Sequence, residues 1–252
     1  MKAAIMQPTY LPWIGYFDMI DQVDTFVFLD DVQLVKRSWG VRNRIKTPQG
    51  ELMLTVPVRK TKSREETFYS NAKINYEEKW TEKHLESIKR AYSKSSNFSE
   101  FFPVIEKLLS AKYDTVAGLN ISIIKTFAGL LGLNTKFLRS SDLSGIEGAK
   151  DERLVSICKK INAGYYLSAR GSAEYIERNN PGGAFSKNGI ELYYHNYVHP
   201  IYKQLSGNFI PFMSVIDLIF NEGLENSLEI IRSGRREPVH FKNIKNFVSE
   251  SQ

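Results

Sequence analysis

The loop from Gln7 to Phe17 is rich in proline and aromatic residues and has the composition of a ligand-binding corner. Trp13 and Tyr16 carry flat rings on which a base or a sugar can stack, and Gly15 permits close backbone approach. The loop follows an apolar strand and opens a helix, whose first amides favour an anionic group. The structural alternative is a rigid turn that closes the edge of the core. The substrate contacts expected from this loop are Gln7, Tyr10, Trp13 and Tyr16.

Asp30, Asp31 and Gln33 follow the second predicted strand. Adjacent residues of an extended segment point to opposite sides, so only one of the two aspartates faces the site. We expect Asp31 to be catalytic, either binding a sugar hydroxyl or amine or orienting a base, and Gln33 to contact the substrate. The sequence identifies no cofactor, although Mg²⁺ is an alternative at Asp31 because hard cations take carboxylates together with phosphates. A turn carboxylate is the structural alternative.

Cations and one aromatic ring are mixed in the next segment, as expected for a diphosphate clamp. A solvated basic hairpin is the competing interpretation. Further along, Arg170 lies among small residues between a strand and a helix, where a phosphate can bind, but the segment lacks the Gly-Lys-Ser/Thr ending of a P-loop. The substrate-binding residues expected here are Arg37, Trp39, Arg42, Asn43, Lys46 and Arg170.

His199 is the candidate general base, because a neutral imidazole is the usual side chain for taking a proton near pH 7. Tyr202 and Gln204 lie close to it in the sequence and are expected to orient it or to bind substrate. His84 shares a predicted helical face with Trp80 and is a second candidate, with a structural histidine as the alternative. Four scattered histidines and one cysteine have no zinc-binding spacing, so no metal site is predicted.

Short apolar strands alternate with helical segments, which predicts an α/β fold with a mostly parallel sheet. Ligands of such sheets bind beyond the carboxyl ends of the strands. We expect residues 1–75 and 135–200 to form the ligand-binding core and 76–134 a helical insertion or lobe. Residues 201–236 are expected to form C-terminal helices, and 237–252 a loosely ordered tail. Strands are predicted at 2–6, 25–29, 52–58, 135–138, 165–168 and 190–194, and helices at 14–23, 76–92, 99–110, 115–131, 151–161, 172–177, 214–221 and 224–232.

The 252 residues carry a formal net charge of +6, which favours anionic partners. Because no nucleic-acid motif and no long basic arm is visible, a phosphorylated small molecule is a better match than a nucleic acid. A single cysteine excludes an intrachain disulfide and is typical of a reducing compartment. The first residues are too short an apolar stretch for a signal peptide, and no apolar run is long enough to span a membrane. A cytoplasmic protein is therefore expected.

Several sequence motifs together resemble the WbqC-like protein family. The resemblance extends from about residue 4 to residue 223, and only the combined pattern makes it specific. Family members tend to be encoded beside genes of polysaccharide and modified-sugar biosynthesis. The matching motifs are Gln7-Pro8-x-Tyr10-x-Pro12-Trp13-x-Gly15-Tyr16-Phe17, Asp30-Asp31-Val32-Gln33, Arg42-Asn43-Arg44-Ile45-Lys46, Trp80 with His84 and Tyr92, Tyr166-Leu167-Ser168, His199-Pro200-x-Tyr202-x-Gln204 and Ser214-Val215-Ile216-Asp217-Leu218-Ile219-Phe220-Asn221.

The first strand, its proline loop and the helix-opening Trp13-Ile14-Gly15-Tyr16 also resemble the layout of nucleotidylyltransferase-like (HUP-type) folds. In those folds a His-x-Gly-His motif holds the nucleotide phosphates, whereas Trp13 and Tyr16 stand at the two histidine positions here. Tryptophan cannot replace a protonated imidazole beside a developing phosphate charge. We therefore expect a HUP-type N-terminal half with a helical lobe, but not adenylyl transfer by that mechanism.

The family resemblance implies a transferase of surface-polysaccharide (O-antigen) sugar biosynthesis. Its substrate would be a nucleotide-linked amino sugar bound between the Gln7–Phe17 loop and the Asp31–Lys46 segment. His199 would deprotonate the acceptor, and a donor would supply an acyl or aminoacyl group. The alternative is a non-catalytic protein of the same pathway that binds a sugar nucleotide or a lipid carrier.

Overall fold

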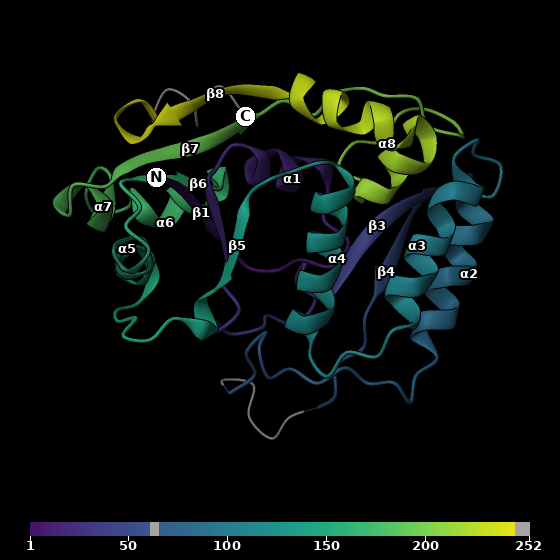
Figure 1. The fold of residues 1–252 in the computed structure, drawn as a ribbon, viewed down its shortest axis with the longest axis horizontal. Coiled ribbons are helices and arrows are strands. Elements are labelled where there is room, and N and C mark those ends of the chain that lie inside the picture. The colour runs from purple at the N-terminus through teal and green to yellow at the C-terminus, as the bar shows by residue number, and fades with distance from the viewer. Residues whose placement is uncertain (61–65, 245–252) are drawn as a thin grey trace.

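The computed structural model describes residues 1–60 and 66–244. A six-stranded sheet with the order β5-β2-β1-β6-β7-β8 lies at its centre (Figure 1). The first five strands in this order run parallel, and β8 pairs antiparallel with β7. This confirms the expected α/β fold with a mostly parallel sheet. The strands are β1 (Lys2–Met6), β2 (Thr25–Phe28), β5 (Lys136–Arg139), β6 (Tyr165–Ser168), β7 (Glu191–Tyr197) and β8 (Arg235–His240).

Helices cover both faces of the sheet. On one face Ala4 of β1 packs in the same apolar cluster as α1 (Ile14–Asp21) and α4 (Val116–Leu130). On the other face Ala3 and Ile5 pack with α5 (Lys150–Lys160). Burial on both faces explains why the central strands are continuous apolar runs and not alternating ones. The second face also carries α6 (Ala173–Ile176), α7 (Gly183–Lys187) and the short turn η3 (Phe241–Asn243). The short turns η1 (Ser140–Asp142) and η2 (Arg170–Ser172) follow β5 and β6.

The helical segment predicted as a lobe shares a core with the sheet. The ring of Phe127 in α4 lies 6.2 Å from that of Phe17 in α1. Phe101 in turn lies 5.8 Å from Phe127 and 5.2 Å from Phe220. One continuous apolar cluster therefore joins the sheet to the helices drawn in the right-hand part of Figure 1. These helices are α2 (Trp80–Tyr92), α3 (Phe98–Ser110) and α8 (Val215–Ser233).

A two-stranded hairpin, β3 (Arg42–Thr47) and β4 (Gly50–Thr55), lies outside the main sheet. The strand predicted at 52–58 corresponds to β4, while β3 was not predicted because its sequence is strongly basic. The alternating burial of side chains along β3 explains why this basic segment is a strand. Asn43 and Ile45 point inward, whereas Arg42 and Arg44 lie on the partly exposed face. The competing interpretation of this segment as a basic hairpin is therefore correct for its backbone.

One prediction for the C-terminal part needs correction. A loosely ordered tail was expected from residue 237. Residues 237–240 instead belong to β8, whose backbone hydrogen-bonds to β7. Residues 245–252 lie outside the described residues. The helices predicted at 214–221 and 224–232 correspond to the two parts of α8, which are separated by the non-helical residue Gly223. Gly223 has φ 78°, a left-handed conformation that glycine adopts without strain.

The strand order reverses next to β1. The chain moves from β1 to β2 and β5 on one side, then crosses to β6 and β7 on the other. The switch point therefore lies between the carboxyl ends of β1 and β6, where open parallel sheets place their ligands. Gln7 follows β1 and Arg170 follows β6 at this point.

Candidate functional site

Hydrogen bonds from the Asn43 side chain and from the Ser214 backbone join three segments of the family-like motifs around β3. The Asn43 amide donates to the carbonyl oxygens of Tyr10 at 3.1 Å and Leu11 at 2.8 Å. This anchors the proline loop at Leu11, which has φ 43°, an unfavourable value for a residue with a side chain. The start of α8 is fixed to the same strand because Ser214 N donates to the Arg44 carbonyl at 2.9 Å. The expected substrate residue Asn43 is thus a buried structural link.

His199 lies against Trp13, as the predicted site required. The two rings are nearly parallel, with centroids 6.0 Å apart. Tyr202, Phe209 and Phe212 surround the imidazole at centroid distances of 6.2, 5.6 and 5.1 Å. Trp13 lies more than 180 positions before His199 in the sequence. Together with Tyr202, Phe209 and Phe212 it nevertheless forms one aromatic enclosure around the His199 imidazole.

The hydrogen bonds of His199 define which nitrogen is basic. Nδ1 lies 2.8 Å from the Pro200 carbonyl oxygen, which only accepts, so Nδ1 carries the hydrogen. Nε2 is then the unprotonated nitrogen, and it is buried with no hydrogen-bond partner among the described residues. Burial also lowers the pKa of His199, which favours the neutral ring. These are the tautomer and charge state that a general base needs.

A buried carboxylate, Asp217, lies at the other end of this enclosure. Tyr92 donates to its Oδ1 at 2.8 Å, and Tyr202 and Gln204 each donate to its Oδ2 at 2.8 Å. Burial raises the pKa of Asp217, while these hydrogen bonds oppose the rise. Because Tyr202 contacts both His199 and Asp217, the two titratable groups belong to one connected cluster.

Lys46 completes the cluster through Gln204. Its Nζ donates to Gln204 Oε1 at 2.9 Å and to the Asn208 carbonyl at 2.6 Å. Burial lowers the pKa of Lys46, and the charge of Asp217 acts in the opposite direction. We call this group the His199 cluster; its members are Trp13, Lys46, Tyr92, His199, Tyr202, Gln204 and Asp217. Sequence analysis identified five of them as site residues, while Tyr92 and Asp217 entered it only through the family motifs.

Tyr10, Tyr16 and His84 do not offer their side chains to a ligand. The Tyr10 hydroxyl is 2.9 Å from His84 Nδ1, and both residues are buried. Burial lowers the pKa of His84 to about 4, so the ring is neutral at pH 7. Tyr16 is also buried, and its hydroxyl donates to the Gln7 carbonyl at 3.1 Å. The expectation of substrate contacts from these three rings is corrected, because they fill the core beneath the proline loop.

Asp31 lies at the carboxyl end of β2 and contacts a different set of residues from His199. Ser140 Oγ donates to its Oδ1 at 2.5 Å, and Arg153 forms an ion pair with Oδ2. The neighbouring Asp30 is fully buried and accepts from Arg139 Nε at 2.8 Å. Asp30 therefore links the ends of β2 and β5, and Asp31 links the end of β2 to η1 and α5. The structure does not bring Asp31 beside His199 as the predicted catalytic pair.

Of the remaining predicted substrate residues, Gln33, Arg37 and Trp39 are exposed in the loop before β3, and Arg42 is partly exposed at the start of β3. The guanidinium carbons of Arg42 and Arg44 lie 5.9 and 5.6 Å from the Trp39 ring. Trp39 is 48% exposed, so this group presents an aromatic face bordered by cations. Arg37 and Gln33 are exposed beside it on the segment that precedes β3.

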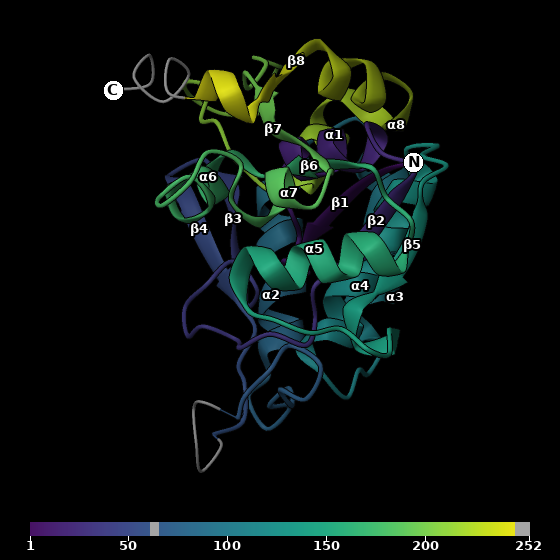
Figure 2. The same ribbon diagram turned by 90° about the vertical axis from the view of Figure 1, so that its left-hand side faces the viewer.

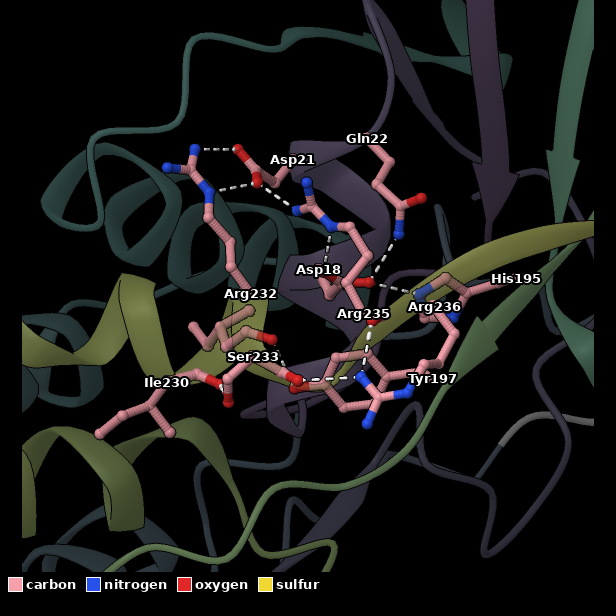
Figure 3. Close-up of polar contacts among 11 residues, drawn as sticks. Asp18, Asp21, Gln22, His195, Tyr197, Ile230, Arg232, Ser233, Arg235 and Arg236 are labelled. Atoms are coloured by element: carbon pink, nitrogen blue, oxygen red, sulfur yellow. Dashed lines mark hydrogen bonds and ion pairs between the residues drawn. The ribbon is translucent and has the colours of Figure 1, made fainter.

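A second buried polar network, drawn in Figure 3, was not predicted. Asp18 of α1 is fully buried and accepts from Arg235 Nε at 2.8 Å and Gln22 Nε2 at 2.6 Å. His195 Nε2 lies 2.7 Å from the same carboxylate. The network connects α1 with β7 and β8. A charged residue on the apolar inner face of a predicted helix was the only signal for it in the sequence.

A cavity of about 590 Å³ lies elsewhere, between α5 and the α6–α7 segment. It has no lining residue in common with the His199 cluster. We place the candidate site at the cluster because an oriented basic nitrogen carries reaction chemistry, whereas a cavity alone does not. Within residues 1–60 and 66–244, no group of three potential metal-ligating side chains is positioned to hold an ion. In the same part of the chain, no helix is both long and apolar enough to cross a membrane.

Comparisons with known proteins agree with the distribution of these motifs. The model of the WbqC-like protein family matches residues 7–229. Uncharacterized protein Rv1507c of Mycobacterium tuberculosis is 34% identical over 226 residues, which cover 89% of this chain and 95% of that protein. No solved structure matches the chain. The matched region includes every residue of the His199 cluster, and we conclude that this chain belongs to the WbqC-like protein family.

Proposed function

We propose that the protein is a transferase of surface-polysaccharide (O-antigen) sugar biosynthesis. It transfers an acyl or aminoacyl group to the amine of a nucleotide-linked amino sugar. The observation that carries this proposal is the unpartnered, unprotonated Nε2 of His199 within the family-matched cluster. The family resemblance is the reason for proposing this pathway. The His199 imidazole is the reason for proposing a proton transfer from the acceptor amine.

In the proposed reaction the acceptor amine attacks the carbonyl carbon of the donor. A nitrogen–carbon bond forms, the bond from that carbon to the donor's leaving group breaks, and the amine proton passes to His199 Nε2. The imidazolium then returns this proton to the leaving group. Lys46 and Asp217 act on His199 only through the residues between them, so they are positioning residues.

The nucleotide is proposed to bind at the switch point between β1 and β6, in a HUP-type arrangement. Gln7 and Arg170 flank that point, and Arg170 offers a cation for a phosphate. Trp13 follows β1, and His199 follows β7, so both extend from the same edge of the sheet. A sugar attached to a nucleotide at the switch point can therefore reach the aromatic enclosure.

The non-catalytic alternative is favoured by one specific observation. Nε2 of His199 is buried, so a substrate amine reaches it only after surrounding rings move. Phe212, which is 47% exposed, is the ring in this enclosure that borders solvent. A protein that only bound a sugar nucleotide or lipid carrier would not need access to this nitrogen.

The transferase and the non-catalytic binding protein differ in whether an acylated product forms. Purified protein would be incubated with UDP- or dTDP-linked amino sugars and acyl or aminoacyl donors, and N-acylated products measured by mass spectrometry. We expect product with the wild type and with His240→Gln, and product formed roughly 100-fold more slowly with His199→Gln. Selective binding of the nucleotide sugar without turnover, unchanged by His199→Gln, would establish the binding protein instead.

A further inference from the structure

The cavity between α5 and the α6–α7 segment has the size of a small-molecule site. Its volume of about 590 Å³ lies within the range of roughly 300–1,000 Å³ that ligand pockets span. These helices lie together on one face of the sheet in Figure 2, and their apolar cluster is separate from that of α1 and α8. The cavity is therefore distinct from the His199 cluster.

Three cations from separate segments line this cavity. Lys150 begins α5, Arg178 follows α6, and Lys187 ends α7. Among the described residues, none of these three side chains has an ion-pair or hydrogen-bond partner. Lys159 differs, because its Nζ donates to Asn188 Oδ1 at 2.6 Å. The lining holds four cations against three carboxylates, Glu147, Asp151 and Glu152, so its net charge is positive and favours an anionic group such as a phosphate.

The rest of the lining is suited to hydroxyl groups. The amides of Asn179 and Asn180 and the carboxylate of Glu152 provide both donors and acceptors. Tyr175 contributes a ring on which the apolar face of a sugar can stack. Burial raises the pKa of Tyr175 to about 12, so its hydroxyl also remains a donor at neutral pH.

Close backbone packing fixes the shape of the cavity. Asp151 Oδ2 accepts from Ala184 N at 2.8 Å, which holds α7 against α5. Gly183 has φ 49°, and a Cβ atom there would lie 2.5 Å from Asp151 Oδ2. Only glycine allows this approach, so the walls are formed before any ligand binds.

We infer that this cavity binds an anionic, hydroxyl-rich small molecule of the sugar-phosphate class, at a site separate from the His199 cluster. The phosphate lies among Lys150, Arg178 and Lys187, and the sugar lies against Tyr175 and the asparagine amides. This inference does not depend on the transferase proposal.

Calorimetric titration of the full chain with glucose 1-phosphate tests the inference. We expect saturable binding that the double variant Arg178→Ala/Lys187→Ala weakens by at least roughly ten-fold, because two charge-assisted contacts are lost. The control Lys89→Ala/Lys107→Ala removes the same charge from α2 and α3 and should bind as the wild type does. His199→Gln should also bind normally, whatever the outcome of the transferase assay.

Several results would overturn the inference. Absence of binding by the wild type would remove the site. Equal weakening by the two double variants would show that net charge alone attracts the probe. Binding of inorganic phosphate as tight as that of glucose 1-phosphate would exclude recognition of the sugar. Loss of binding in His199→Gln would assign the probe to the His199 cluster.

Discussion

The hydroxyl of Tyr92 donates a hydrogen bond of 2.8 Å to Oδ1 of Asp217, which links α2 to the first turn of α8. Asp217 is fully buried, so this contact has no competition from water. The rings of Tyr92 and Phe220 stack beside it at 4.7 Å. The helical segment and the His199 cluster are thereby joined through a buried hydrogen bond and a stacked ring pair.

Replacing Asp217 should destabilise the protein. Asp217→Ala leaves the hydroxyls of Tyr92 and Tyr202 and the amide of Gln204 without their acceptor, and we expect a loss of about 3 kcal/mol. Asp217→Asn preserves the shape and one acceptor oxygen, so its loss should be smaller. Urea unfolding measures both, with exposed Glu225→Ala as the control. Equal stability of Asp217→Ala and the control would contradict a structural role for the carboxylate.

The pH dependence of catalysis should reflect the lowered pKa of His199. A general base acts when unprotonated, so kcat/KM should rise with pH, with the midpoint of the rise below the usual imidazole pKa of about 6.5. In His199→Gln this acidic limb should vanish, and kcat should fall by roughly 100-fold. A profile that titrates near 9 or higher in the wild type would point to a different base.

Gly15 should tolerate no larger residue, because Trp13 folds back over it. A Cβ atom at Gly15 would lie 2.1 Å from the end of the indole ring. Gly15→Ala must therefore displace Trp13 from His199, at a cost of about 1–3 kcal/mol. Thermal unfolding and the transferase assay should both report the change. The control Gly129→Ala lies in α4 with no atom within 4 Å, and should stabilise the helix by up to about 1 kcal/mol.

Stability should fall in acid because of His84. Its pKa is about 4 in the folded protein and about 6.5 when unfolded, so the unfolded chain binds the extra proton between these values. Its contribution is complete above pH 6.5 and is lost as the pH falls toward 4, a change of about 3 kcal/mol. Unfolding free energies of His84→Gln should show a correspondingly shallower slope across this range. His240→Gln should retain the wild-type slope; identical slopes for all three proteins would refute the assignment.

The network in Figure 3 should anchor the C-terminal strand. Arg235→Met removes the guanidinium from the buried carboxylate of Asp18, while His195 and Gln22 remain. Because these partners persist and Arg235 is partly exposed, we expect a loss of about 2 kcal/mol. Hydrogen exchange of the β8 amides should accelerate as well. Arg236→Met, on the exposed neighbour, supplies the matched control, and similar exchange in both variants would argue against the anchor.

The sequence determined the local elements and the family. The ranges of β1, β2, β6, α3 and α5 were predicted to within one or two residues, because apolar periodicity is a property of neighbouring residues. The motifs of the WbqC-like family are equally local, and each was visible as a short string. The Trp13–His199 pairing was anticipated only as a hypothesis that the two motifs share a site.

Only the tertiary structure decided which side chains meet and which are buried. Lys46 and Gln204 are separated by 158 positions, and Asp18 and His195 by 177, so no local pattern could pair them. Tyr10 lies in a loop whose composition is typical of a ligand-binding site. The packing of α2 against this proline loop nevertheless brings the Tyr10 hydroxyl within hydrogen-bonding distance of His84. β8 is polar and forms a strand because β7 supplies its hydrogen-bonding partners. The burial of a side chain and the contacts it makes depend on segments that are distant in the sequence. For that reason the local sequence predicted most residues of the His199 cluster but not the contacts among them.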